Sequence, residues 1–345
     1  MKRFFWMAVM FGLCAVLCGC TAVTPQRVQS VDTAMGTVIQ QNIFKVGEDT
    51  DFTGEIMDLI RSLEEDLLSR RLATSEVYAV NRSAGSPEGQ NISEELAEML
   101  EQCLEMTERS GGTFDVTLGP VIRLWDIDGW AAGLEEGEFQ VPSEEELTRA
   151  LALCGSRKMR LEQGESGARL YLEEGMELDL GAVGKGLALT EVLAYLKEHN
   201  AISGAVISVG GSVLTYGEKP DGTGWRVGVA DPRDPAENLG VIVLEGQWCV
   251  STSGDYERYV EAGGIRYHHI LDPVTGYPAD SGLCSVTVVT KDGLLSDALS
   301  TACFVLGREE GMELVRLYDA EALFVTGDGS VSMTPGMEGM FQPAR

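Results

Sequence analysis

The sequence is poor in positive charge and has no long apolar run after its first twenty residues. Its 345 residues carry 26 Lys and Arg against 54 Asp and Glu, a formal net charge of −28. This balance argues against a protein that coats nucleic acid, because neutralising phosphates requires Lys and Arg. An anionic ligand would need a metal cation or backbone amides to bind here. A body without about 18 consecutive apolar residues is not expected to be transmembrane.

Cysteine pairs and the common hydrolase motifs are also missing. Three of the eight cysteines lie in the leader, and the other five are odd in number and form no CxxC. Neither a disulfide framework nor a zinc ribbon is therefore expected. The sequence has no GxSxG and no SxxK, so the usual serine-hydrolase signatures are absent. The five remaining cysteines are predicted to be small buried apolar residues: Cys103, Cys154, Cys249, Cys284 and Cys303.

The chain begins with an export leader. Two basic residues precede an uncharged stretch at 4–17, which is too short to span a bilayer comfortably and suits a signal peptide. The sequence Leu17-Cys18-Gly19-Cys20 then resembles a bacterial lipobox. The resemblance implies a signal peptide at 1–19, a lipidated Cys20, a polar tether at 21–30 and an extracytoplasmic protein, lipid-anchored to a bacterial membrane. An ordinary signal peptide or a signal anchor is the alternative.

Helical and extended patterns are mixed along the body. Apolar spacing predicts helices at 51–68, 93–110, 185–198 and 294–306, and Ser143 with Glu146 forms a capping box before another helix. Strands are predicted at 31–46 (with a break at 35–37), 158–162, 168–172, 176–180, 204–209, 225–230, 239–245, 248–252, 284–290 and 321–326. Because the alternation is not strict and no Pro/Gly/Ser-rich linker divides the chain, we predict an α+β fold. It would form a single two-lobed domain at 31–340, with mixed sheets and flanking helices.

A glycine-rich turn at 177–187 predicts an anion site. The pattern is a strand, a turn and a helix start, which points backbone N–H groups and a helix dipole at an anion. It is not a Walker A loop, because two residues rather than four separate Gly181 from Gly184 and no Ser or Thr follows Lys185, and its glycines do not follow the GxGxxG order. Asp179 before the turn and Lys185 within it place opposite charges beside one phosphate-sized gap, which strengthens this interpretation.

Two further patterns carry possible chemistry. Asp297 and Thr301 lie four residues apart on one helix face, and their oxygens suit a hard cation such as Mg²⁺. Alternatively, Asp297 is a first-turn residue favoured by the helix dipole. His268 and His269 would point to opposite faces of a strand, so only one can face a site. No third ligand is spaced for zinc, which leaves acid–base work or a phosphate contact.

Aromatic residues in the segment 111–126 have two readings. Phe114 and Trp125 could stack on a planar ring, or they could belong to the core.

Together these segments resemble the ApbE family of FAD:protein FMN transferases. The resemblance spans about residues 31–330 and is carried by motifs in the family's order. These are 35–37, 112–117 with 119–120, 179–186, 209–211, 251–254, 269–276 (His-Ile-Leu-Asp-Pro-Val-Thr-Gly) and 296–301. Many members of the family are lipoproteins, which agrees with Cys20.

The resemblance implies an activity and a set of site residues. The activity is Mg²⁺-dependent transfer of FMN from FAD to a Thr or Ser hydroxyl of an extracytoplasmic acceptor protein, with release of AMP. FAD, the acceptor and the membrane would be its partners, and nucleic acid would not. By motif position, Ala182 (through its carbonyl), Asp297 and Thr301 would hold the metal, with Asp297 and His269 catalytic. Met35, Arg71, Thr113, Phe114, Asp115, Asp179, Lys185 and His269 would line the nucleotide.

One residue departs from the family's pattern. Relatives often carry an aromatic side chain where Arg71 stands, and Arg71 could stack, pair with phosphate or lie in solvent. The exclusion of water from the site is therefore open. Two alternatives remain: a Mg²⁺-dependent FAD pyrophosphatase that yields FMN and AMP, and a flavin-binding lipoprotein without catalysis.

Overall fold

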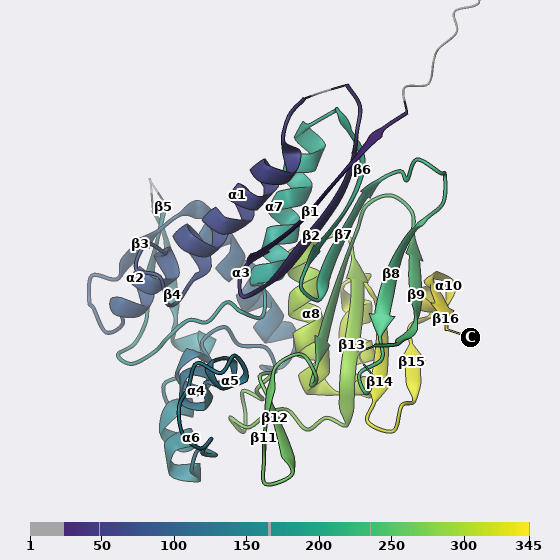
Figure 1. The fold of residues 1–345 in the computed structure, drawn as a ribbon. Coiled ribbons are helices and arrows are strands. Elements are labelled where there is room, and N and C mark those ends of the chain that lie inside the picture. The colour runs from purple at the N-terminus through teal and green to yellow at the C-terminus, as the bar shows by residue number, and fades with distance from the viewer. Residues whose placement is uncertain (1–23, 48, 165–166, 235, 345) are drawn as a thin grey trace, which may run out of the picture.

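The structure is a computed structural model that describes residues 24–47, 49–164, 167–234 and 236–344 (Figure 1). The predicted signal peptide at 1–19 and the predicted lipidation of Cys20 lie outside these residues. In the described ranges, no helix combines the length and the apolar character that a membrane crossing needs. The fold is α+β with two lobes, as predicted.

An antiparallel sheet organises the larger lobe. Among the described residues its order is β1-β2-β6-β7-β10-β13-β14-β15. These strands are β1 (Gln26–Ala34), β2 (Thr37–Lys45), β6 (Ile202–Val209), β7 (Ser212–Gly217), β10 (Trp248–Gly254), β13 (Leu283–Thr290), β14 (Glu321–Thr326) and β15 (Val331–Met333). Met35 and Gly36, both at positive φ, form the turn between β1 and β2, so this end of the sheet carries a tight loop.

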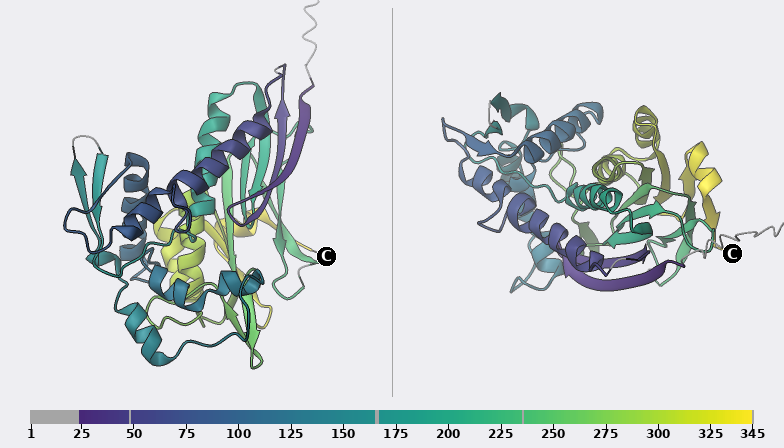
Figure 2. Two further views of the ribbon diagram at one scale, coloured as in Figure 1. Left: turned by 60° about the vertical axis from the view of Figure 1, so that its left-hand side comes forward. Right: turned by 90° about the horizontal axis from the view of Figure 1, so that it is seen from above.

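Both faces of this main sheet are covered. Its helical face packs against α1 (Phe52–Ser62), α7 (Gly184–Glu198), α8 (Gly293–Leu306) and α9 (Arg308–Leu317), as Figures 1 and 2 show. Its outer face packs against a three-stranded sheet, β16-β9-β8, and α10 (Pro335–Met340). The three strands are β8 (Trp225–Ala230), β9 (Asn238–Leu244) and β16 (Phe341–Pro343). Because it is covered on both sides, β13 is buried along its whole length.

The smaller lobe is built from local elements. The π-helix η1 (Leu63–Leu68) continues α1, and α2 (Glu76–Arg82) and α3 (Glu94–Arg109) pack near a sheet of order β3-β5-β4. Those strands are β3 (Gln90–Ile92), β5 (Gly167–Tyr171) and β4 (Arg160–Gly164). In the chain, β5 is followed by the turn that starts α7. The short helix η2 (Ser156–Lys158) precedes β4.

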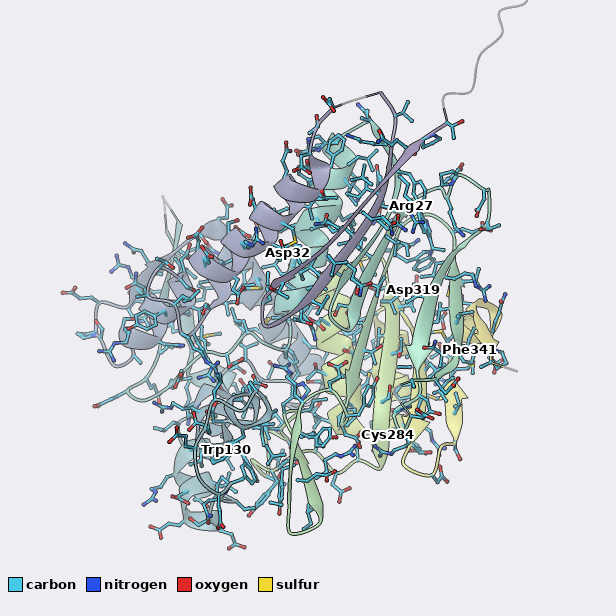
Figure 3. All side chains as sticks on the ribbon, viewed as in Figure 1. Arg27, Asp32, Trp130, Cys284, Asp319 and Phe341 are labelled. Atoms are coloured by element: carbon cyan, nitrogen blue, oxygen red, sulfur yellow. The ribbon has the colours of Figure 1, made fainter. Side chains whose placement is uncertain are left out.

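A third group of elements joins the two lobes. The helices α4 (Gly119–Trp125), α5 (Ile127–Ala131) and α6 (Glu144–Leu151) surround Trp125, in the region where Figure 3 labels Trp130. The hairpin of β11 (Tyr259–Ala262) and β12 (Ile265–His268) reaches them, because Val260 and Tyr267 pack in the same apolar cluster. This contact encloses the space between the hairpin and the start of α7.

The predicted helices and capping box are confirmed. The helices expected at 51–68, 93–110, 185–198 and 294–306 are α1 with η1, α3, α7 and α8. The Ser143 hydroxyl accepts the N–H of Glu146, and the Glu146 carboxylate accepts the N–H of Ser143.

The predicted strand at 176–180 is wrong. The side-chain amide of Asn81 bonds both the N–H and the carbonyl of Leu178, and the N–H of Asp179 donates to the carbonyl of Val116. A side chain thus takes the place of a partner strand, and only an isolated bridge forms in this segment. The apolar alternation that suggested a strand reflects burial.

The predicted tether at 21–30 is too long. β1 begins at Gln26, opposite Lys45, and pairs with β2 along its full length. Arg27, labelled in Figure 3, adds a bond from its Nε to the Asn42 side chain (2.7 Å). The strand ladder therefore includes a segment whose polar composition suggested a free linker.

Candidate active site

The glycine-rich turn forms the N-terminus of α7, as predicted. Asp179 Oδ1 accepts the N–H of Gly181 (2.9 Å), which holds the turn, and α7 then starts at Gly184. The first N–H groups of a helix of 15 residues favour a negative group, because most lack an intrahelical acceptor and lie at the positive end of the dipole. Lys185 adds a full positive charge in the first turn.

Asp297 is the buried acid of the site. It is 2% exposed, and its Oδ2 accepts the N–H of Gly186 (2.9 Å) while its Oδ1 accepts the Ser212 hydroxyl (3.4 Å). Burial raises the pKa of this carboxyl, and the charge of Lys185 opposes the rise. No described cation makes an ion pair with it, so the carboxylate has unused capacity for a positive partner.

Thr301 follows Asp297 by one turn on the same face of α8, as predicted. Its hydroxyl lies 3.3 Å from Ser253 Oγ, which in turn lies 2.8 Å from Ser300 Oγ. These hydroxyl groups fix Thr301 from the side of β10. Oxygen donors on one helix face thus converge beside the turn.

The adjacent histidines diverge as predicted. His268 is buried, bonds the carbonyl of Ala279 through Nε2 (3.1 Å) and meets Phe304 edge-on. His269 Nδ1 lies 3.2 Å from the carbonyl oxygen of Arg258. A carbonyl only accepts, so Nδ1 carries the proton and Nε2 keeps a free lone pair. Burial, with the charges of Arg258 and Lys185, holds the pKa of His269 well below its usual range.

The aromatic residues of 111–126 are mainly core residues. Phe114 and Trp125 are 2% and 1% exposed, and the Trp125 indole donates to the carbonyl of Gly276 (2.7 Å). The Asp115 carboxylate is also occupied, because it accepts from Thr117 and from the N–H of Ser156. These residues build the wall of the site and present only an edge to it.

Arg70, which sequence reasoning missed, enters the site in place of Arg71. Its Nε lies 2.7 Å from Asp179 Oδ2, and a second ion pair links it to Glu177 (3.5 Å). Arg71 is exposed, pairs with Asp126 (3.5 Å) and lines neither of the cavities described next. The two side chains thus make ion pairs with different carboxylates, and no residue pattern signalled which of the two would line the site.

Two connected cavities bring the predicted residues together. The inner cavity is about 120 Å³ and the outer cavity about 510 Å³. Since ligand sites typically measure roughly 300–1,000 Å³, the inner cavity is one part of a larger site. They share Gly181, Lys185, Glu257 and Arg258. The inner cavity is lined by nine of the predicted residues, Thr113, Phe114, Asp115, Asp179, Ala182, Lys185, His269, Asp297 and Thr301, and the outer cavity by Met35.

Glu257 and Arg258 are the other residues that the sequence did not predict. They follow β10 and stand where the two cavities meet. Burial raises the pKa of Glu257, opposed by Lys185 and Arg258. Arg258 also pairs with Asp128 (2.9 Å), which ties the start of the hairpin to α5. Their position directly after the motif at 251–254 was a signal that could have found them.

The donor set suits Mg²⁺ better than zinc. Among the described residues no three His, Cys, Asp or Glu side chains gather to hold a metal. Asp297, Thr301 and Ala182 line one cavity and contain a carboxylate, a hydroxyl and a backbone carbonyl oxygen that could serve as ligands. Mg²⁺ is typically held by one or two carboxylates, with waters and substrate phosphates completing its shell. The buried, unpaired carboxylate of Asp297 therefore fits this ion.

Comparison with known proteins decides the family. The sequence model of the ApbE family matches residues 35–324. The chain belongs to the ApbE family. Two curated relatives, each named FAD:protein FMN transferase, come from Treponema pallidum and Klebsiella pneumoniae. The first is 34% identical (82% of this chain, 79% of the relative) and the second 33% identical (90% and 92%).

Solved ApbE structures share the fold. The ApbE protein of Thermotoga maritima superposes with a TM-score of 0.79 at 29% identity, covering 92% of this chain and all of the other. The apo form of the flavinyl transferase ApbE of Pseudomonas stutzeri gives 0.78 at 30% identity, covering 93% and 98%. The family and the fold predicted from sequence are thus confirmed, and the predicted enzyme class agrees with the names of these ApbE relatives.

Proposed function

We propose that this chain is a Mg²⁺-dependent FAD:protein FMN transferase that acts on a Thr or Ser hydroxyl of an extracytoplasmic acceptor and releases AMP. The names of the relatives support the transferase activity. One observation carries the assignment of the site: Lys185, His269 and the pair Asp297 and Thr301, which come from three separate segments of the chain, line a single cavity at the N-terminus of α7.

Positive groups of the chain would bind and orient the diphosphate of FAD. The N-terminus of α7, Lys185 and Arg258 face the region shared by both cavities. Transfer of a phosphoryl group depends mainly on positioning and on neutralising charge, which these groups supply. The net charge of −28 does not prevent binding, because the site has its own local cations.

Asp297, Thr301 and the Ala182 carbonyl would hold the metal. A bound Mg²⁺ would neutralise the phosphate oxygens as a Lewis acid. Gly186 and Ser212 donate hydrogen bonds to the Asp297 carboxylate and so fix its orientation. The Ser253 hydroxyl, 3.3 Å from Thr301 Oγ1, orients the hydroxyl of Thr301.

His269 would accept the proton of the attacking hydroxyl. Its lowered pKa keeps the imidazole neutral, and its Nε2 lone pair is free because Nδ1 is engaged with the Arg258 carbonyl. The acceptor oxygen forms a bond to the FMN-side phosphorus, and the bond from that phosphorus to the bridging oxygen breaks. AMP leaves with the bridging oxygen, and the proton on His269 passes to water.

A single mixture tests this function against its alternatives. The protein is incubated with FAD, MgCl₂ and an extracytoplasmic protein extract from a strain lacking the gene. Transfer leaves flavin fluorescence on a protein band after denaturation, and AMP appears in the same amount. FMN and AMP without a labelled band would identify a pyrophosphatase. Bound but intact FAD would identify a flavin-binding protein.

We also propose that the chain is lipid-anchored through Cys20 on the extracytoplasmic side. The support is the sequence at 1–20, with its basic start, its short apolar stretch and its resemblance to a lipobox. Replacing Cys20 with Ser should release the protein from the membrane fraction and abolish labelling with an alkyne-tagged fatty acid. Continued labelling would contradict the assignment.

A further inference from the structure

The outer face of the main sheet is only partly covered. The small sheet that covers it ends at β8, with Phe341 of β16 at its opposite edge (Figure 3). Beyond β8, Val206 of β6 and Val213 of β7 pack against the same apolar cluster but remain half-buried. The small sheet therefore covers β6 and β7 at the Trp225 end of β8, where the indole donates to the carbonyl of Gly217 and packs near Phe44, and leaves them less covered toward Ala230.

A groove of about 420 Å³ follows this uncovered strip. Valine side chains of the main sheet and four residues of β8 line it. One end of the groove meets the candidate active site through three shared residues. Thr252 also lines the inner cavity, Gly211 the outer cavity, and Glu257 both of them. A chain lying in the groove would therefore end against the wall of the candidate active site.

β8 has a free side along this groove. It pairs with β9 only, and no backbone hydrogen bond outside that ladder involves residues 225–230 in the described part of the chain. An edge strand presents alternate N–H and C=O groups to which an extended segment can add. At about 3.3 Å per residue, a strand of this length matches roughly five or six residues of a partner.

Arg226 is the one cationic side chain among the described residues that line the groove. It is exposed on β8, and its guanidinium donates to the side chain of Gln342 (3.1 Å). It forms no ion pair with any described carboxylate, although acids outnumber bases twofold in the chain. The guanidinium reaches across β9 to β16, and with only this neutral partner it could turn toward the free side of β8 if a partner strand offered a carboxylate there.

We infer that this groove binds an extended segment of the acceptor protein as an added strand beside β8. An Asp or Glu of that segment lies opposite Arg226, and the Thr or Ser to be modified passes Thr252 and Glu257 toward His269. The inference rests on the proposed transferase function and adds the form in which the acceptor is recognised.

The first test uses synthetic peptides as acceptors. Each peptide has about twelve residues with one central Thr, and a single Asp or Lys is scanned through the other positions. We expect flavin transfer to peptides with Asp at one position to exceed transfer to the matching Lys peptides by about tenfold, or about 1.4 kcal/mol. Arg226→Glu should reverse this preference. Arg316→Glu, an exposed charge reversal on α9, should leave it unchanged.

The second test blocks the groove without touching the cavities. Ser208 lies on β6 and lines the groove, whereas Ser203 on the same strand lines none of the three spaces. Ser208→Trp should raise the KM for the peptide about tenfold or more, with little change in FAD affinity. Ser203→Trp should change neither. Hydrogen exchange should show peptide-dependent protection of β8 amides in the native protein and in Ser203→Trp only.

The outcomes separate the two proposals. If the native protein does not bind FAD, the transferase function fails. If it binds FAD but labels no peptide, or if Ser208→Trp and Arg226→Glu both act like their controls, the acceptor groove is overturned. A shift in KM and in charge preference at constant FAD affinity supports it.

Discussion

Gly186 of α7 and Gly293 of α8 lie in direct backbone contact. A Cβ atom built on Gly186 would stand 2.3 Å from the carbonyl oxygen of Gly293, and one on Gly293 would stand 2.3 Å from the carbonyl oxygen of Gly186. Only glycine at both positions lets the two helix starts approach this closely. The contact sets the distance from the Gly186 N–H to Asp297, and thereby links the anion turn to the buried acid.

The glycine contact predicts a strong effect from one methyl group. Gly293→Ala would force α7 and α8 apart and should lower the free energy of unfolding by about 1–3 kcal/mol. The same variant should bind FAD more weakly in the presence of Mg²⁺, because the anion turn and Asp297 would no longer be correctly spaced. Gly339→Ala is the control, since nothing lies within 4 Å of that position, and it should be neutral or slightly stabilising. Urea unfolding of both variants gives the comparison, and equal curves would refute the contact's role.

Asp297→Asn should separate stability from activity. The raised pKa of Asp297 means that its stabilising contribution is present at acid pH and is lost as pH rises through the folded-state pKa. At neutral pH without metal, the Asn variant should therefore be at least as stable as the native chain. Transfer should fall about a hundredfold or more, and Mg²⁺ with FAD should no longer raise the melting temperature. Asp280→Asn, an exposed site, is the control; a native response to Mg²⁺ in Asp297→Asn would remove the metal assignment.

His269→Gln should lower turnover more than FAD affinity. Loss of the base is expected to reduce kcat by about 10²–10⁴-fold, while the Kd for FAD stays within about twofold. Stopped transfer assays and fluorescence titration give the two values. If affinity falls and kcat does not, His269 is a binding residue.

Arg258 should control the pH dependence of transfer. The pKa of His269 is lowered by burial and then by the charges of Arg258 and Lys185. The neutral imidazole therefore persists well below its reference pKa of about 6.5, and kcat should fall only at more acidic pH. Arg258→Gln removes one of these charges and should raise the pKa of His269, so that kcat begins to fall at a higher pH. Arg266→Gln, in the same hairpin, should not; identical profiles for both variants would exclude the electrostatic effect.

The five described cysteines should be inert in the folded protein. Burial raises the pKa of Cys103, Cys154 and Cys249 to about 12, and that of Cys284 and Cys303 also rises. All five are free and buried, as the sequence predicted. Iodoacetamide at pH 8 should label none of them in the native state and all of them in urea, because the thiolate is the reactive form. Mass spectrometry counts the labels.

Local patterns predicted much of the site. Lys185 and Asp297 each lie in a turn or helix start whose own residues specify the conformation, and both residues line the inner cavity. The divergence of His268 and His269 followed from strand geometry. Non-local pairing limited the rest, because Glu257 and Arg258 reach the site only through the β11–β12 hairpin and its contact with α5.

The incorrect prediction of a strand at 176–180 also results from a non-local contact. Its alternation of apolar residues predicted a pleated partner, but Asn81, almost a hundred residues earlier, supplies the hydrogen bonds with a side chain. No pattern in the local sequence predicts that a distant side chain will supply these hydrogen bonds. The choice between Arg70 and Arg71 was equally hidden, since it depends on where Asp179 and Asp126 lie after folding.

β1 lies between the proposed lipid anchor and the outer cavity. Its first residue, Gln26, follows Cys20 by few enough residues that an anchored chain starts within about 20 Å of the lipid. The strand is followed by Met35, which lines the outer cavity. Met35 lies about 30 Å from Gln26 along the strand. If Cys20 carries the lipid, as proposed above, the segment before β1 and the strand itself together set an upper limit of about 50 Å on the distance from the bilayer surface to the outer cavity.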